Sequence, residues 1–221
     1  MFLSRVVLMV FALFLCASTG GVAYAKEPRN LTFIKQDLVH YHDSGEYEKD
    51  IARVTQQAQA YLRARLNQHS NKKLAIVLDI DETSLSNYPD MVVLRFGGTL
   101  KEIDEAIGKG QDPEIQPTLK LYQFAKANHV AVFFVTARRE NVRAATEANL
   151  EKAGYHQWDG IFFLPVDYHE KSVLDFKVGS RKKIIEQGYD IVLNVSDQNA
   201  DLRGGYADKA FKLPNPFYLI P

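Results

Sequence analysis

Four short runs of apolar residues recur along the chain, and polar residues follow each of them. The runs are residues 74–79 (LAIVLD), 130–136 (VAVFFVT), 160–165 (GIFFLP) and 191–197 (IVLNVSD). Consecutive positions are apolar rather than alternate ones, which is typical of strands covered on both faces in a parallel sheet. A shorter run at 210–215 (AFKLPN) predicts a last strand.

Apolar residues at helical spacing separate these runs. The predicted helices are one from a cap formed by Asp43 and Glu46 to the stretch 71–73 (NKK), one after Pro117, one at 140–154 and one at 180–188. The last two end at glycines. Residues 26–42 are predicted to be an irregular arm, and residues 82–116 to be irregular apart from a short helix at 101–107.

Strands that alternate with helices over short connections predict an α/β fold, a doubly wound parallel sheet with right-handed crossovers. Sheets of this kind bind ligands at the carboxyl ends of their strands. The residues that follow each apolar run are therefore the candidates for a functional site.

The first 25 residues resemble a secretory signal peptide. Arg5 precedes an apolar stretch too short to span a membrane comfortably, and the stretch 23–25 (AYA) has the small-x-small pattern of a cleavage site. The alternative is a lipoprotein anchored at Cys16, the only cysteine of the chain, although the bulky Leu15 precedes it. We expect residues 26–221 to form one exported domain with neither a membrane anchor nor disulfides.

The balance of charge bears on the class of partner. The chain has 27 basic and 27 acidic residues, and the first 25 residues contain one of these charges, Arg5. A nearly neutral domain argues against a surface for nucleic acid polymers or anionic membranes.

Polar residues that suit a metal and phosphate site follow the apolar runs. Asp79 ends the first run and Asp81 follows it, Thr136 ends the second run, and Asp197 ends the fourth run and Asp201 follows it. A lysine in the stretch 175–183 (DFKVGSRKK) lies between the third and fourth runs. Clustered carboxylates repel one another unless a cation lies among them, and oxygen ligands without histidine or cysteine suit Mg²⁺. An anionic substrate such as a phosphate then completes the site.

Each of these features alone has an ordinary structural explanation. Two acids in a loop are usually solvated or cap a helix, and a lysine at a helix start usually faces solvent. Four features in order, each at the carboxyl end of a predicted strand, favour a functional site.

The motifs DIDET (79–83), VTAR (135–138), FKVGSRKK (176–183) and SDQNADL (196–202) resemble the four motifs of the haloacid dehalogenase (HAD) superfamily. The closing segment, residues 181–221, is similar to the subfamily IIIB acid phosphatases, which include class B-like secreted bacterial acid phosphatases and plant vegetative storage proteins. The resemblance covers the chain from about residue 30. It implies a HAD-like Rossmannoid fold with an N-terminal helix and a small, mostly helical cap insert at approximately residues 84–117.

The resemblance also implies roles for the acids. Asp79 is the expected nucleophile, and Asp81 the expected general acid and then general base. Metal ligands are expected from Asp79, the Asp81 backbone carbonyl and Asp197, while Asp201 is expected to orient a metal-bound water.

Thr136 and Lys177 are expected to contact the phosphoryl group, Thr136 through its hydroxyl and Lys177 through its charge. Lys171, Lys182 and Lys183 compete for the lysine role, and Lys177 is preferred because FKVGSRKK has the family's spacing. Arg138 either contacts phosphate or substrate, or lies on the surface at a helix start.

Three further features are open to two interpretations. Ser196 stands where the family commonly has glycine, and we expect the turn to survive this substitution. Tyr88, Phe96 and Tyr122 either form a stacking wall for a substrate or, more ordinarily, pack between cap and core. His40 and His42 could suggest a metal, but without acidic or cysteine partners we expect surface positions.

The expected protein is a secreted or periplasmic, Mg²⁺-dependent acid phosphatase that hydrolyses small phosphomonoesters through an aspartyl-phosphate. The alternatives are a non-catalytic storage or binding protein on the same fold, and a phosphotransferase. The presence of every motif residue favours an enzyme, but the sequence does not separate hydrolysis from phosphotransfer.

Overall fold

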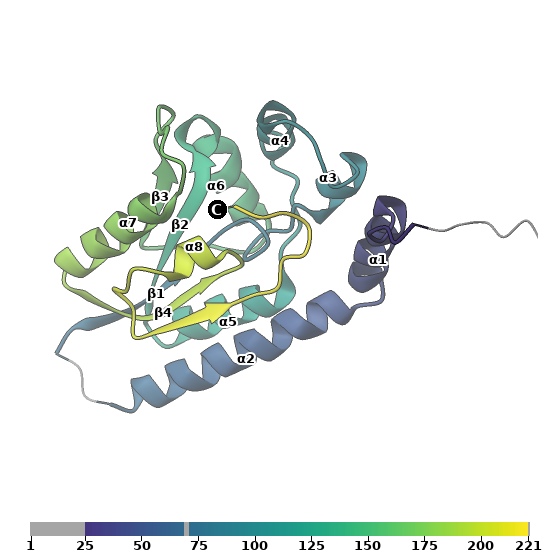
Figure 1. Cartoon of the computed structure of the whole chain (residues 1–221). Helices are drawn as coiled ribbons and strands as arrows, with labels where there is room; N and C mark the ends of the chain where they lie inside the picture. Colours follow the sequence, from purple (N-terminus) through teal and green to yellow (C-terminus); the bar gives the residue numbers. More distant parts are fainter. Residues whose placement is uncertain (1–24, 69–70, 221) are drawn as a thin grey trace, which may run out of the picture.

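The computed structural model describes residues 25–68 and 71–220, so the predicted signal peptide falls, except for residue 25, outside the described residues. The described chain forms one parallel sheet in the order β3-β2-β1-β4-β5 (Figure 1). The strands are β1 (Lys73–Leu78), β2 (Ala131–Arg139), β3 (Gly160–Leu164), β4 (Tyr189–Ser196) and β5 (Lys209–Lys212). The prediction of a doubly wound α/β sheet is confirmed.

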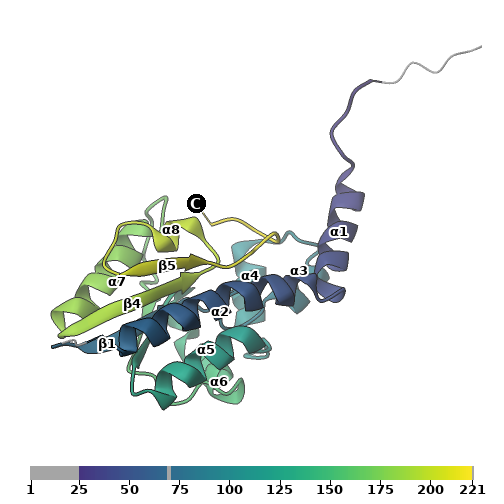
Figure 2. The same ribbon diagram turned by 90° about the horizontal axis from the view of Figure 1, so that it is seen from below.

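Helices cover both faces of this sheet. Helices α2 (Glu46–Leu66), α5 (Gln116–Ala127) and α6 (Arg143–Lys152) lie on one face, and α7 (Leu174–Glu186) lies on the other (Figure 2). In β1, Ile76 and Leu78 belong to the first core, and Ala75 and Val77 to the second. Burying an aliphatic side chain contributes about 1.5–3 kcal/mol, so both sides of the strand need apolar residues.

The sheet order creates a crevice beside β1. The chain passes from β1 to β2 through α5 and from β2 to β3 through η1 (Glu140–Val142) and α6, and then returns through α7 to β4 on the other side of β1. The reversal lies between β1 and β4, whose ends pair at Leu78 and Val195. This is the point at which such sheets bind ligands.

The segment predicted to be a cap lies at the carboxyl end of the sheet (Figure 1). It contains α3 (Tyr88–Val93), which was not predicted, and α4 (Leu100–Ile107), which was. A capping box between Thr99 and Glu102 begins α4. The short helix α8 (Asn199–Leu202) and the C-terminal strap, defined as residues 213–220, reach the same end of the sheet.

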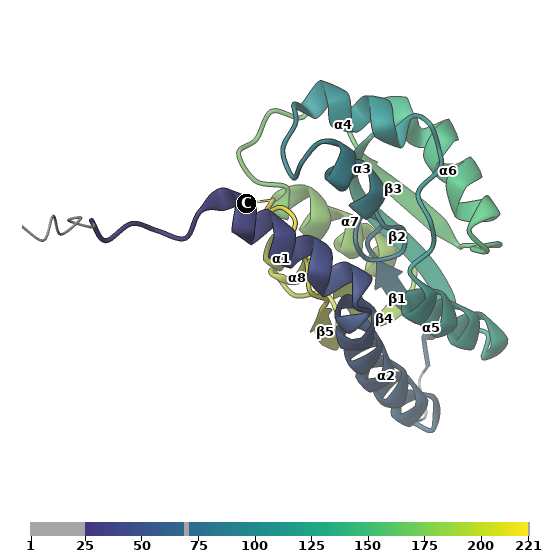
Figure 3. The same ribbon diagram turned by 90° about the vertical axis from the view of Figure 1, so that its right-hand side faces the viewer.

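The prediction of an irregular arm at residues 26–42 was wrong. Helix α1 (Leu31–Asp43) occupies most of it, and the Asn30 side chain caps the helix by accepting from Thr32 N. It projects from the body of the fold and buries none of its residues (Figures 2 and 3). Leu38 and Tyr41 of α1 are only partly buried against the core, so the helix lacks the fully buried apolar stripe that makes a helix recognisable in a sequence.

Two helix starts also differ from the prediction. Helix α2 follows Gly45, whose φ of 79° suits glycine, and Asp43 ends α1 instead of capping α2. Helix α7 begins at Leu174 rather than Ser180, where the Ser172 hydroxyl accepts from Leu174 N. Within residues 25–68 and 71–220, no helix combines the length and apolar character needed to cross a membrane.

Candidate active site

A tight turn after β1 fixes the positions of Asp79 and Asp81. Asp79 N donates to Val195 O of β4 at 3.0 Å, and the Ile80 carbonyl accepts from Ser84 N at 2.8 Å. The Ser84 hydroxyl closes the turn by donating to Asp79 O at 2.7 Å. Ile80 is buried in the core, so it anchors the turn between the two aspartates.

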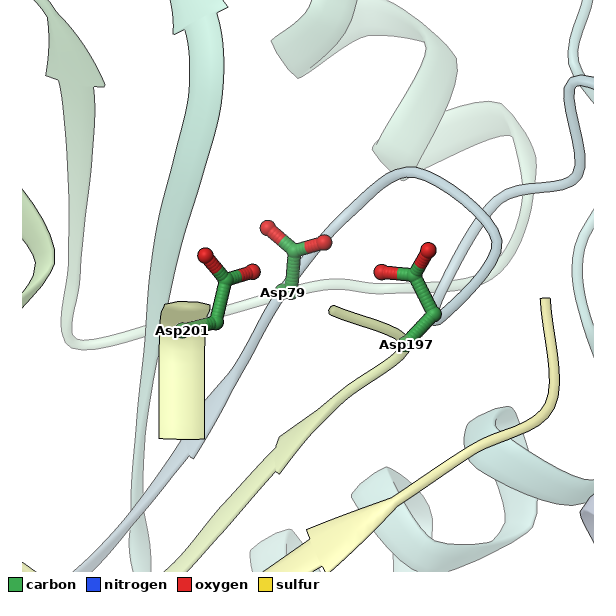
Figure 4. A group of neighbouring side chains, drawn as sticks. All are labelled: Asp79, Asp197 and Asp201. Atoms are coloured by element: carbon green, nitrogen blue, oxygen red, sulfur yellow. The ribbon is translucent and has the colours of Figure 1, made fainter. Parts of the chain in front are cut away.

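Three acids meet at the end of β1 and β4. One carboxylate oxygen from each of Asp79, Asp197 and Asp201 lies within 4.8 Å of the others, and all three residues are buried (Figure 4). Oδ1 of Asp201 is buried with no hydrogen-bond partner among the described residues. Buried carboxylates that repel one another, one with an unsatisfied acceptor, form a group that could hold a metal ion.

Lys177 of α7 connects two of these acids. Its Nζ donates to Asp79 Oδ1 at 2.7 Å, to Asp201 Oδ2 at 2.8 Å and to Val135 O at 2.8 Å, which satisfies all three ammonium hydrogens. The competing candidates Lys171, Lys182 and Lys183 are exposed. The helix start at Leu174 places Lys177 in the crevice.

The charges in this cluster do not balance. Burial raises the pKa of Asp79 well above its usual range, against the lowering effect of Lys177, and Asp201 and Asp197 raise it further. Burial likewise raises the pKa of Asp197. Lys177 is itself charged, because its two carboxylate partners outweigh its burial and raise its pKa. One ammonium therefore faces three carboxyl groups, and a cation would complete the balance.

Asp81 lies outside the acid cluster and binds Arg138 instead. Arg138 Nε and Nη2 donate to Asp81 Oδ1 at 3.0 and 2.9 Å, and Nη2 also donates to Asp112 Oδ2 at 2.7 Å. Burial would raise the pKa of Asp81, but the charge and hydrogen bonds of Arg138 lower it below its usual value. Asp112 has less compensation, and burial raises its pKa to about 6.

The surface position considered for Arg138 was wrong. Arg138 lies in β2 with a fully buried side chain, and its third nitrogen, Nη1, donates to Thr146 Oγ1 at 3.2 Å. Thr136, two residues earlier, is also buried, and its Oγ1 accepts from Arg138 N at 3.0 Å. The Thr136 hydroxyl hydrogen is therefore not used in that bond.

Ser196, the residue at the family's glycine position, ends β4 next to the acids. Its hydroxyl donates to Asp201 Oδ2 at 2.6 Å and accepts from Gln198 N at 3.2 Å. The turn survives, as predicted, and the side chain adds a hydrogen bond that glycine cannot make.

Sequence reasoning missed the residues that hold Asp197. Gln198 Nε2 and Asn215 Nδ2 both donate to Asp197 Oδ2 at 2.6 Å. Asn215 Oδ1 also accepts from Phe217 N at 2.8 Å, so the C-terminal strap is attached to the acid cluster. The stretch 213–216 (LPNP) was available as a signal, because an amide between two prolines after the last strand marks a fixed turn.

A cavity of about 490 Å³ lies beside Asp81, between α3, α4 and the C-terminal strap. Its walls are largely apolar and include Phe96, Phe217 and Tyr218. The Tyr218 hydroxyl is buried without a partner among the described residues. A cavity with apolar walls that opens on a carboxylate can hold the organic part of an ester.

The aromatic residues considered for stacking lie in different places. Phe96 lines the cavity beside Asp81. Tyr122 packs against Tyr155 in the core at 5.0 Å between ring centroids, and Tyr88 stacks on His42 at 3.4 Å. For Tyr88 and Tyr122 the packing interpretation is correct. His42 also binds Asp43 at 2.9 Å, and neither it nor His40 belongs to a metal-holding group among the described residues.

Comparison with known proteins identifies several that are similar. A family model described as HAD superfamily, subfamily IIIB (Acid phosphatase) matches residues 15–221. The Stem 28 kDa glycoprotein of Glycine max is 37% identical over 188 residues, covering 81% of this chain and 72% of the relative. Acid phosphatase 1 of Solanum lycopersicum is 34% identical over 178 residues, with 79% and 69% covered. Vegetative storage protein 2 of Arabidopsis thaliana is 29% identical over 184 residues, with 80% and 68% covered.

Solved structures of the class C acid phosphatase from Bacillus anthracis share the fold. One superimposes with a TM-score of 0.71 at 24% identity, and the other, with tungstate bound, with a TM-score of 0.70 at 25% identity. Each covers 84% of this chain and 86% of the compared chain.

Proposed function

Because the chain belongs to subfamily IIIB of the HAD superfamily, the acid phosphatases, we propose that it hydrolyses phosphomonoesters with Mg²⁺ through an aspartyl-phosphate on Asp79. Family membership makes it a phosphoric monoester hydrolase that acts on small phosphate esters. The metal, the intermediate and the residue roles are our proposal. The observation that carries them is the buried group of Asp79, Asp197 and Asp201 with Lys177 among them.

Asp79 is the nucleophile. Lys177 holds its Oδ1, so we assign the attack on phosphorus to Oδ2, which forms the aspartyl-phosphate as the ester oxygen leaves. The Lys177 ammonium then lies where the negative charge of the phosphoryl group arrives. Thr136, whose oxygen accepts from Arg138 N, keeps its hydroxyl hydrogen for a phosphoryl oxygen.

Asp81 is the general acid for the leaving oxygen and then the general base for water. Arg138 keeps the pKa of Asp81 low before substrate binds, and the charge of an incoming phosphate dianion raises it toward the protonated form. After the alcohol leaves, the ionised carboxylate accepts a proton from the attacking water. Four of the five N–H donors of Arg138 bind Asp81, Asp112 and Thr146, so we assign Arg138 to Asp81 rather than to the phosphate.

Mg²⁺ fits the acid cluster because every available donor is oxygen. We propose Asp79, Asp197 and the Asp81 backbone carbonyl as ligands. The unpartnered Oδ1 of Asp201 supports a direct ligand there too, rather than a residue that only orients water. When bound, the cation offsets the charge of the acids and of the phosphoryl group.

The remaining parts of the proposal concern export and the cap. We propose that residues 1–25 direct secretion to the periplasm or the medium and are then removed, and that residues 84–117 act as a cap over the cavity beside Asp81. The similarity to vegetative storage proteins favours the storage alternative. A storage role does not explain why an ammonium is buried between two buried acids. This arrangement supports the enzyme.

Purified protein comprising residues 26–221 is expected to hydrolyse 4-nitrophenyl phosphate at mildly acidic pH. EDTA should stop the reaction, because the acid cluster then loses its cation, and excess Mg²⁺ should restore it. Addition of an alcohol, with release of inorganic phosphate and of 4-nitrophenol measured separately, distinguishes transfer from hydrolysis. A protein that folds but is inactive with Mg²⁺ on a panel of phosphomonoesters would favour the storage alternative.

The hydroxyl of Ser196 is expected to strengthen metal binding. Ser196→Ala and Ser196→Gly both remove its bond to Asp201, and we expect Mg²⁺ affinity, measured by isothermal titration calorimetry, to fall roughly 10-fold in each. An equal loss in the two variants assigns the effect to the hydroxyl, and a loss in glycine alone would assign it to backbone freedom. Unchanged affinity in both would contradict the role.

A further inference from the structure

The two carboxylate oxygens of Asp81 have unequal surroundings. Oδ1 accepts from Arg138 Nε at 3.0 Å, from Arg138 Nη2 at 2.9 Å and from Asn87 Nδ2 at 2.8 Å. Among the described residues, Oδ2 accepts one bond, from Arg138 Nε at 3.3 Å. The carboxyl group is thus held through Oδ1, and Oδ2 has room for a proton.

The orientation of Asn87 follows from its partner. An ionised carboxylate only accepts hydrogen bonds, so the amide nitrogen of Asn87 must face Asp81. Asn87 is almost fully buried, and it lines the cavity beside Asp81. Its other amide atom, Oδ1, has no partner among the described residues, so the bond to Asp81 is the contact that the side chain makes.

A buried brace holds Asn87 in place. Its backbone N–H donates to Glu82 Oε1 at 2.6 Å, and the same oxygen accepts from the Ser86 hydroxyl at 3.2 Å. The other Glu82 oxygen accepts from the hydroxyl of Tyr47 in α2. Glu82 has a φ of 48°, a strained conformation for a residue with a side chain, which the brace maintains.

We propose that Asn87 and Arg138 are positioning residues that fix Oδ1 of Asp81 and leave Oδ2 as the atom that exchanges the proton with the leaving oxygen. The inference rests on the proposed function, in which Asp81 is the general acid. As the ester bond to phosphorus breaks, its electron pair stays on the leaving oxygen, and the proton of Oδ2 moves to that oxygen. The water that later attacks the aspartyl-phosphate returns a proton to Oδ2.

A misplaced acid has a distinctive effect on rate. A poor leaving group needs the proton, whereas a good one departs as an anion without it. Phenyl phosphate and 4-nitrophenyl phosphate differ in this respect, and neither ring carries a hydrogen-bond donor for the free amide oxygen of Asn87. The ratio of kcat/KM for the two substrates reports acid catalysis in the steps up to departure of the phenol. Because both kcat/KM values scale with the fraction of active protein, their ratio does not depend on that fraction.

In Asn87→Ala, kcat/KM for phenyl phosphate is expected to fall about 10-fold more than kcat/KM for 4-nitrophenyl phosphate. Arg138→Lys, which keeps the charge but lacks the planar fork, should move the ratio in the same direction. Tyr155→Phe is the matched control, because it deletes a buried hydroxyl bonded to Ser84 in the same loop without contact to Asp81. It should lower both rates equally.

Asp81→Asn distinguishes the general-acid role of Asp81 from the positioning role of Asn87 and Arg138. If this variant changes the ratio of kcat/KM for the two substrates by roughly 10²-fold, the result supports Asp81 as the acid. If that change occurs and the ratios of Asn87→Ala and Arg138→Lys match that of Tyr155→Phe, the positioning role is overturned and the proposed function stands. If Asp81→Asn leaves the ratio unchanged, the acid role itself fails.

Discussion

Asp79→Asn is expected to fold normally and to lose phosphatase activity by roughly 10⁴-fold or more, because the amide cannot attack phosphorus as a carboxylate does. The variant should be at least as stable as the natural protein in EDTA. Burial and the neighbouring acids raise the pKa of Asp79, so its ionised form costs folding energy that the amide does not. Phosphatase assays check the expected loss of activity, and urea unfolding in EDTA checks the expected stability.

The control for this variant is Asp175→Asn, which alters an exposed aspartate of α7. Its activity and stability should match those of the natural protein. Acid-quenched enzyme examined by mass spectrometry should carry a phosphoryl group in the natural protein and none in Asp79→Asn. Activity of Asp79→Asn within tenfold of the natural protein would sink the mechanism.

Lys177→Met is expected to combine a loss of activity with a loss of stability. Removing one partner of a buried ion pair typically costs about 3–5 kcal/mol, and Lys177 contacts both Asp79 and Asp201. The phosphoryl group also loses its ammonium, and we expect kcat to fall on the order of 10²–10³-fold. Urea unfolding in EDTA and steady-state kinetics with Mg²⁺ measure the two effects.

The stability loss in Lys177→Met should depend on pH. Lys177 lowers the pKa of Asp79, which burial raises. Without the ammonium, the pKa of Asp79 in the folded state rises further, so the folded protein binds more protons than the unfolded chain. Stability then falls as pH increases through this pKa, and the difference from the natural protein should be larger at pH 7.5 than at pH 5. Lys182→Met, at an exposed position of the same helix with a 3.9 Å contact to Glu186, should have little effect at either pH. An equal loss at both pH values would contradict the ion-pair explanation.

The sequence predicted the sheet and the position of the acids because both depend on local patterns. A run such as 74–79 must be apolar on both faces to lie between two layers, and aspartates directly after it must lie at the strand end. Lys177 was preferred on motif spacing, and the structure places it between Asp79 and Asp201.

Features that depend on distant contacts could not be predicted. In the sequence, Arg138 follows the apolar run 130–136 and precedes the predicted helix at 140–154, which is also the pattern of an exposed residue. Only the fold brings Asp81 and Asp112 to it and excludes water. The roles of Asn87 and Glu82 could not be predicted either, because they depend on a loop conformation in which Glu82 has a φ of 48°.

The buried charge cluster also bears on how such a site is lost or kept over evolution. Asp79 and Asp201 share one ammonium, so a change in either alters the electrostatic reason for retaining the other. Once catalysis no longer mattered, neutral substitution of the acids together with Lys177 would relieve the cost of burying these charges, whereas loss of Lys177 alone would destabilise the fold. In a lineage selected for protein abundance alone, we therefore expect the ammonium and its acids to be lost as a group rather than one at a time.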